Sequence, residues 1–206
     1  MRLLSKTLLT VAVLATPMLA QAESTFTTGA GTPITATARV DFQITVPKIL
    51  FLRVGTGTTD YATVGTINQI AFAVPAANLG DSSAIAATAA SGDLGNGAVT
   101  ARVIGNNGNV TLTSTTLGAL GNGSGDTISY SQINTAATVL NSTTALAAPA
   151  LADGAVTSTT VAAVNKIVNR DARWTYTYLN GAVVAPGTYG GINTNNSRVT
   201  YTASMP

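Results

Sequence analysis

Residues Ile34–Val46 read ITATARVDFQITV, and apolar and polar side chains alternate without a break along this stretch. The apolar positions are Ile34, Ala36, Ala38, Val40, Phe42, Ile44 and Val46. Because successive side chains of a β-strand point to opposite faces, the pattern predicts a long N-terminal strand with one apolar edge. Such a strand can complete the sheet of its own domain, or it can pair with the sheet of a neighbouring molecule. The sequence leaves both alternatives open.

Further strands are predicted along the rest of the chain, where short runs of apolar and β-branched residues are separated by Gly, Asn and Pro. The predicted strands span residues 48–54, 67–74, 98–104, 109–113, 127–133, about 155–168, 173–178 and 198–203. The turn Gly105-Asn106-Asn107-Gly108 predicts that the strands on either side of it pair as a hairpin. The chain is therefore expected to be all-β, an antiparallel β-sandwich of the immunoglobulin-like or pilin-like kind.

The first residues have the pattern of a secretory signal peptide. A positively charged start precedes an apolar run over 8–14, and small residues at Ala20 and Ala22 mark a cleavage site. A membrane anchor is the alternative, but the run is shorter than the roughly 20 residues that a bilayer requires. We expect a signal peptide over 1–22, a flexible leader over 23–33 and one β-sandwich domain over 34–206.

Removal of the signal peptide changes the charge balance. Arg2 and Lys6 account for two of the ten basic residues, so eight remain against eight acidic residues. The mature chain shows no basic patch, which argues against nucleic acid or an anionic membrane as a partner. A net charge near zero and few charged residues favour association between copies.

The sequence contains no His and no Cys. This excludes Ser-His-Asp and Cys-His catalysis, the common zinc sites and thiol redox chemistry. The acidic residues are scattered at turns, and the loop Gly121–Asp126 offers calcium a single carboxylate where several are usual. Neither Lys48 nor Lys166 lies in a Ser-x-x-Lys motif. We therefore predict that the protein is not an enzyme and has no catalytic residue, cofactor or metal site.

Aromatic residues recur at every second position in Trp174, Tyr176 and Tyr178. Such a ladder can form a platform on which a sugar ring stacks. It is more often the core-facing side of a strand, because large aromatic side chains pack well on a half-buried sheet. The core interpretation is favoured, and the ligand platform remains the alternative.

The stretch Ala185-Pro186-Gly187-Thr188-Tyr189, followed by Arg198–Ala203, resembles the closing segment of exported bacterial β-sandwich subunits. These include fimbrial subunits of the chaperone–usher type, spore-coat-U-like pilins and WxL-like cell-surface domains. The segment Val40–Pro47 is similar in style to their N-terminal strands. The chain lacks the cysteine pair that is common in fimbrial subunits, and Gly190–Ser197 interrupts the closing hairpin.

The resemblance implies a structural subunit of a filament at the bacterial cell surface, a homopolymer in which one subunit's N-terminal strand fills a groove in the next. It also implies a periplasmic chaperone and outer-membrane assembly machinery as partners. On this hypothesis Ile34, Val40, Phe42, Ile44 and Val46 make the contact between subunits. The alternative is a monomeric secreted adhesin or carbohydrate-binding module that uses Trp174 and the tyrosines, and a hydrolase is a third, disfavoured hypothesis.

Overall fold

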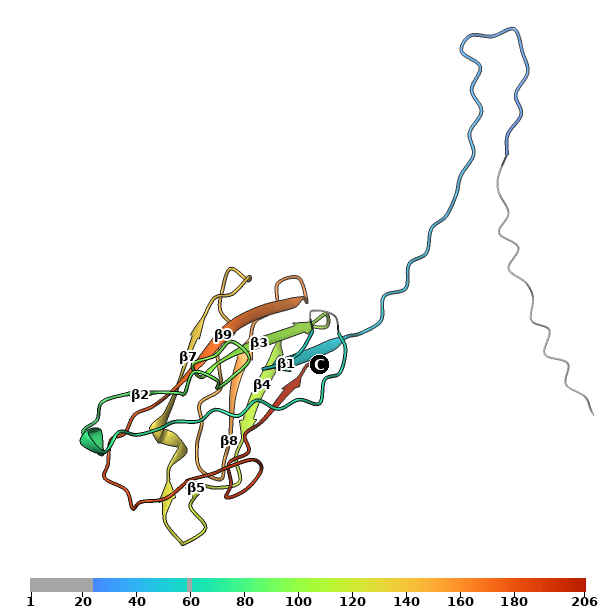
Figure 1. Ribbon diagram of the computed structural model, residues 1–206. Coiled ribbons are helices and arrows are strands. Elements are labelled where there is room, and N and C mark those ends of the chain that lie inside the picture. The colour runs from blue at the N-terminus through green and yellow to red at the C-terminus, as the bar shows by residue number, and fades with distance from the viewer. Residues whose placement is uncertain (1–23, 59–60) are drawn as a thin grey trace, which may run out of the picture. The chain divides into compact units, whose positions relative to one another are not determined.

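The computed structural model describes residues 24–58 and 61–206, so the predicted signal peptide lies outside the described residues (Figure 1). The chain divides into two units between Val46 and Pro47. The second unit, Pro47–Pro206, holds all the strands that the structure describes.

The second unit is built from short antiparallel strands, which confirms the all-β prediction. The strands are β1 (Leu50–Val54), β2 (Ile85–Ala86), β3 (Ala98–Gly105), β4 (Val110–Thr115), β5 (Leu120–Gly121), β6 (Thr127–Ile128), β7 (Ile133–Thr138), β8 (Val156–Val161), β9 (Val168–Tyr178) and β10 (Thr200–Ser204). Two single-turn 3-10 helices span Ala76–Asn78 and Tyr130–Gln132. Among the described residues, no helix has the length and apolar character that a membrane span needs.

The strands form two main sheets (Figure 1). In the first sheet, β9 pairs with β3 and β2 along one edge and with β7 along the other, and β1 pairs with β3. The second sheet has the order β10-β4-β8. A small separate ladder joins β5 and β6. β1 and β10 are the end strands of their sheets, and they lie in contact with one another.

The core lies between the inner faces of the two main sheets. Its fully buried side chains include Val103 from β3, Leu112 from β4 and Trp174 from β9. The Trp174 indole N–H donates a hydrogen bond of 2.7 Å to the Leu146 carbonyl oxygen, and its ring centroid lies 5.2 Å from that of Tyr201. Because a buried indole N–H needs an acceptor, this bond satisfies the one polar atom of the largest core side chain.

The predicted hairpin between residues 98–104 and 109–113 is wrong. β3 pairs with β1 and β9, whereas β4 pairs with β8 and β10, so the turn around Gly108 carries the chain from one sheet to the other. Gly108 has a φ of 106°, a conformation that glycine adopts without steric cost. Each strand occupies the interior of its sheet, so both of its edges are taken by other strands, and the two strands face one another across the core.

The predicted strand over 67–74 is also wrong as a regular strand. The segment forms one bridge, between Phe72 and Ala87. Beside it, the Thr88 N–H donates to the Ala71 carbonyl at 2.8 Å, and the Ala71 N–H donates to the Ser91 hydroxyl at 2.9 Å. A ladder requires a partner strand that continues along the segment, and the neighbouring chain departs after this bridge.

Two other predicted strands are each divided in two. The range 127–133 contains β6, a 3-10 turn and the start of β7. The range 155–168 contains β8 and, after a loop, the first residue of β9. In both places the chain changes direction while the apolar pattern continues. Loops that pack on the core carry apolar residues as strands do, so the pattern does not show where a strand ends.

The long strand predicted over Ile34–Val46 does not form in the described chain. Residues 24–46 have no strand ladder, and the side chains of Thr25 and Thr27 bond to the backbone about ten residues further along the chain. The hydroxyl of Thr25 donates to the Thr37 carbonyl at 2.8 Å, and that of Thr27 donates to the Thr35 carbonyl at 3.2 Å. The alternating pattern is therefore present in a segment that lacks a partner strand.

Asp171 on β9 fixes the loop that follows β7 to the first sheet. Its buried carboxylate accepts hydrogen bonds from the backbone N–H groups of Asn141 and Ser142, at 2.9 and 2.8 Å, and from the Asn141 amide at 2.9 Å. Burial by itself raises the pKa of Asp171, but these hydrogen bonds together outweigh it and lower the pKa to about 2. The carboxylate therefore stabilises the fold in its charged form.

Leu112 and Leu117 form a matched pair for testing the core. Leu112 is fully buried and Leu117 is exposed. Leu112→Ala should lower the free energy of unfolding by about 2–5 kcal/mol, because it removes buried methyl groups and leaves a cavity. Leu117→Ala should change it by less than about 0.5 kcal/mol. Urea unfolding followed by the fluorescence of Trp174 measures both, and equal effects would place the core elsewhere.

Asp171→Asn should reduce the free energy of unfolding at pH 7 by roughly 1–2 kcal/mol, because the amide cannot accept all the hydrogen bonds that the carboxylate accepts. The folded pKa of Asp171 lies below the ordinary value of 3.8. The stabilisation is therefore present above about pH 4 and disappears as the pH falls toward 2. Urea unfolding at several pH values tests this, with Asp41→Asn in the exposed segment as the control. A difference from the unsubstituted protein that persists unchanged at pH 2 would contradict the assignment.

Candidate functional site

The second unit contains an open groove of about 1040 Å³. Two extended segments supply most of its lining, Thr66–Val74 and the chain from Val184 to Tyr201. The first of these is joined to the chain beside the first sheet through Phe72 and Ala87, and the second leads into β10 of the second sheet. The groove therefore lies where the edges of the two sheets meet.

Both end strands beside this groove have an edge without a partner in the described structure. β1 pairs only with β3, and β10 pairs only with β4. Leu52 and Val54 of β1 and Tyr201 of β10 contribute side chains to the groove lining. An open edge exposes backbone N–H and C=O groups that can bond another strand. The groove thus combines apolar side chains with strand edges that are able to accept a further strand.

The lining is mostly apolar. Its apolar aliphatic and aromatic members are Leu52, Val54, Ile67, Ile70, Phe72, Val74, Leu79, Val99, Leu120, Ile128, Tyr130, Ile133, Leu151, Tyr176, Tyr178, Val184, Tyr189, Ile192, Val199 and Tyr201. Arg198 is the one charged side chain among the described lining residues. Ile192 is 77 % exposed and Ile67 is also exposed, so apolar surface along the groove faces solvent. Such a surface is typical of a binding site for an apolar partner.

The hydroxyls of three tyrosines in the groove lining, Tyr130, Tyr176 and Tyr201, are hydrogen-bonded and stay neutral at physiological pH. The hydroxyls of Tyr176 and Tyr201 lie 2.9 Å apart, and the Tyr130 hydroxyl donates to the Asn196 carbonyl at 2.8 Å. Burial, with a smaller contribution from Asp153, raises the pKa of Tyr130 to about 12. Burial also raises the pKa of Tyr176 to about 12 and that of Tyr201 well above its usual value. These groups fix the shape of the groove and add no charge to it.

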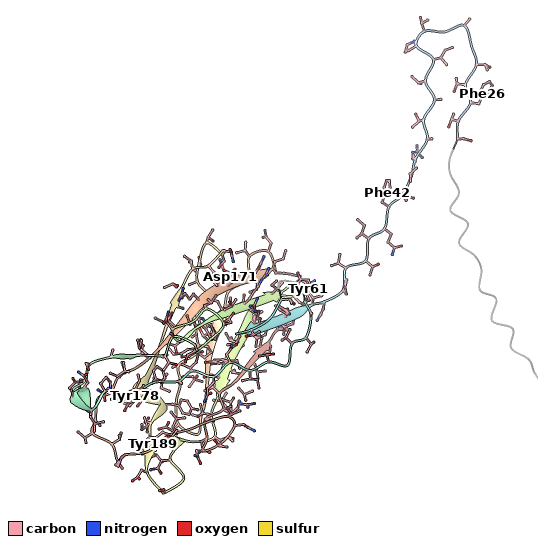
Figure 2. The ribbon with its side chains drawn as sticks, viewed as in Figure 1. Phe26, Phe42, Tyr61, Asp171, Tyr178 and Tyr189 are labelled. Carbon is pink, nitrogen blue, oxygen red and sulfur yellow. The ribbon has the colours of Figure 1, made fainter. Side chains whose placement is uncertain are left out.

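The Ala185–Tyr189 motif forms part of the groove lining. The Tyr189 hydroxyl donates to the Ala185 carbonyl at 2.8 Å, which ties the motif into a compact turn. Nearby in the same lining, the rings of Phe72 and Tyr178 lie 6.2 Å apart. Figure 2 shows Tyr178 and Tyr189 at the same end of the domain. Sequence reasoning noted this motif for its resemblance and missed that it lines a groove.

The proposed subunit-contact residues Ile34, Val40, Phe42, Ile44 and Val46 all belong to the first unit and are exposed. Phe42 is 90 % exposed, and Figure 2 shows its side chain standing off an extended chain. Exposed large apolar side chains are individually common, but an uninterrupted alternating series of them is not. This segment has the side-chain pattern of a strand, and it has no partner strand among the described residues.

The aromatic ladder separates into two environments. Trp174 is fully buried in the core, so its ring has no face available to a sugar. Tyr176 and Tyr178 are also buried, although both contribute to the groove lining. The three residues therefore do not form a surface platform, because the inward face of β9 is covered by the second sheet and its loops.

Sequence reasoning also missed most of the groove residues. Those on 66–74 were predicted from their alternation but were assigned to a paired strand, and those on 184–199 lie in loops without periodicity. No local signal could have found the groove, because it forms where chain segments far apart in sequence meet. Among the described residues, no group of three or more acidic side chains is placed to bind a metal ion.

Comparisons with protein-family models, with curated proteins and with solved structures found no match to this chain.

The neutral tyrosines predict a loss of stability at alkaline pH. Because the folded pKa values of Tyr130 and Tyr176 are raised to about 12, their stabilisation is present below about pH 10 and disappears as the pH rises through 12. Tyrosinate absorbance should rise together with the unfolding signal of Trp174. Tyr176→Phe should make the decline of stability with pH less steep, and Tyr61→Phe, at an exposed position, should not. Ionisation of all tyrosines near pH 10 in a folded protein would contradict this prediction.

Proposed function

We propose that this protein is a non-catalytic structural subunit of an extracellular filament, which polymerises when residues Ile34–Val46 of one copy enter the groove of the next. The observation that carries the proposal is that one chain contains two features that each lack a binding partner. One is an alternating apolar segment without a partner strand, and the other is an apolar groove beside strand edges without a partner.

The segment is long enough to lie along one side of the groove. The segment has thirteen residues, which at about 3.3 Å each span roughly 43 Å as a strand. On one side of the groove the lining comes from Leu52 and Val54 and then from the nine residues Thr66–Val74. A strand laid along these segments would place its apolar side chains in the groove and its polar side chains toward solvent. Pro47 ends the segment, because proline cannot donate a ladder hydrogen bond.

The energetics favour a stable complex. Full burial of Ile, Val or Phe contributes about 1.5–3 kcal/mol per side chain, and Ala contributes less. Ile34, Val40, Phe42, Ile44 and Val46 are exposed in the described chain and have most of this free energy still to gain. Hydrogen bonds to the edges of β1 and β10 would add to it and fix the direction of the strand.

The resemblance to exported bacterial β-sandwich subunits supports the same proposal and suggests the cell surface as the site of assembly. It further suggests a periplasmic chaperone, which would cover the groove before assembly, and outer-membrane machinery for export. A monomeric adhesin or carbohydrate-binding module is the second candidate. It is less well supported, because Trp174, the residue on which a sugar ring would stack under this alternative, is fully buried.

The donor side of the proposal is tested by a pair of adjacent substitutions. Phe42→Asp places a charge on the apolar face of the segment and should abolish filaments, because the carboxylate would have to enter an apolar groove. Gln43→Asp places the same charge on the polar face and should leave assembly intact. Negative-stain microscopy and light scattering of the mature protein measure the outcome. Normal filaments from Phe42→Asp would refute the proposal.

The groove side is tested by a second pair within one loop. Ile192→Asp changes a lining residue that is 77 % exposed, whereas Val183 is 74 % exposed and does not line the groove. Ile192→Asp should prevent assembly and Val183→Asp should not. A mixture of Phe42→Asp and Ile192→Asp proteins retains one intact segment and one intact groove, so it should form heterodimers and no longer species. Filaments from the mixture would show that assembly uses another surface.

A further inference from the structure

Residues Pro47–Ile49 form the connection that precedes β1, and the side chain of Asn106 bonds to the first and the last of them. The side-chain amide of Asn106, in the turn between β3 and β4, donates to the Pro47 carbonyl at 2.8 Å. Its oxygen accepts from the Ile49 N–H at 2.9 Å. Between these two bonds, the Lys48 ammonium group donates to the Pro206 carbonyl at 3.3 Å. All these groups belong to the second unit, so the connection is part of the compact domain.

A side-chain amide offers one acceptor and two donors, so Asn106 binds this connection much as the backbone of a neighbouring strand would. It holds the carbonyl of one residue and the N–H of the residue two positions later. The chain forms no turn over residues 46–49 and continues into β1. Asn106 therefore holds Pro47–Ile49 in a conformation that does not turn before β1 begins.

This arrangement blocks the shortest route by which the chain could fill its own groove. The groove borders β1, so residues 34–46 would have to reverse direction immediately before β1. A β-turn over Val46–Ile49, with Pro47 at the second position that proline favours, is closed by a hydrogen bond from the Ile49 N–H to the Val46 carbonyl. That N–H is already donated to Asn106.

With Pro47–Ile49 held, a reversal has to be made within the segment itself, just before Pro47. A turn of five residues there, over 42–46, uses Phe42, Ile44 and Val46, which are three of the segment's five large apolar side chains. The remaining stretch, Ile34–Val40, contains two alanines among its apolar positions and has less area to bury. A segment from another copy meets no such restriction and can bring every apolar side chain to the groove.

We infer that Asn106 is a positioning residue that directs Ile34–Val46 to the groove of a second copy and away from the groove of its own chain. The inference rests on the proposed function, since it presupposes that the groove accepts this segment. It adds a residue that decides between a closed monomer and a polymer. Removal of the Asn106 amide frees the Ile49 N–H and the Pro47 carbonyl, and a β-turn over Val46–Ile49 that keeps Phe42, Ile44 and Val46 in the groove becomes available.

The test uses the absence of cysteine from the natural sequence. Gln43→Cys on the polar face of the segment and Thr188→Cys in the exposed groove lining are introduced together into the full mature chain. Copies grown with light and heavy nitrogen are mixed while dissociated and allowed to assemble. A flexible bismaleimide then joins cysteines that lie close together. Mass spectrometry of the linked peptides distinguishes links within one chain from links between chains.

With Asn106 intact, we expect mixed-isotope links and a ladder of linked oligomers on denaturing gels. With Asn106→Ala, we expect the ratio of links within a chain to links between chains to rise about tenfold or more, with loss of the ladder. Tenfold corresponds to about 1.4 kcal/mol, which the loss of two neutral hydrogen bonds can supply. Asn134→Ala, at an exposed position on β7, is the control and should keep the ladder.

Asn106→Asp separates the two bonds, because a carboxylate still accepts from the Ile49 N–H but cannot donate to Pro47. It should give an intermediate ratio, and it decides the question if Asn106→Ala does not fold by the fluorescence of Trp174. The role of Asn106 would be overturned if the protein with Asn106 intact gave links within single chains only. It would also be overturned if the folded variants kept the same ratio of links within a chain to links between chains. Absence of any link in every protein would instead count against the proposed function, because the segment would then not reach any groove.

Discussion

The structure depends on one unmet requirement, which is the need of two sheet edges for a further strand. β1 and β10 end their sheets where the sheets meet, and each has an edge without a partner in the described structure. The apolar side chains that a further strand would cover therefore line a groove of about 1040 Å³. Open edges and exposed apolar surface are normally avoided in soluble proteins, because they invite association. Here the same chain carries a segment with the matching alternation, so the association can be specific.

The rest of the domain holds the groove in shape without closing it. The Trp174 indole is bonded to Leu146, and the paired hydroxyls of Tyr176 and Tyr201 connect the two sheets beneath the groove. At its far end, the side-chain oxygen of the buried Asn180 accepts a 3.0 Å hydrogen bond from the N–H of Gly80, next to Leu79 in the lining. Fixed walls reduce the conformational entropy that an entering strand would otherwise have to remove.

The proposed assembly and the role of Asn106 follow from one physical distinction. A strand can satisfy an open edge from within the chain or from outside, and the contacts in the groove are similar in either case. The connection before β1 decides between them, because a hairpin needs a particular backbone hydrogen bond to reverse the chain. The amide of Asn106 takes that donor. Under the proposal, a short-range contact in the domain thus controls whether a long-range contact forms within a molecule or between molecules.

The sequence alone determined the all-β class and the place of most strands, since alternation and turn residues are local properties. It also identified Ile34–Val46 as a two-faced segment and excluded catalysis that needs His or Cys. Tertiary structure decided what the strands pair with. The turn at Gly108 reads locally as a hairpin, yet it crosses between sheets because other strands occupy both edges of β3 and β4.

The sequence likewise could not predict the groove or the partner of the segment Ile34–Val46. The groove lining joins residues near 70 with residues near 190, and no local pattern records that distance in space. Alternation in Ile34–Val46 specifies a strand but carries no information on which edge accepts it, because the side-chain period is the same for any partner. In the proposed assembly, that choice depends on the open edges of β1 and β10 and on the contact between Asn106 and Ile49, which exist only in the folded domain.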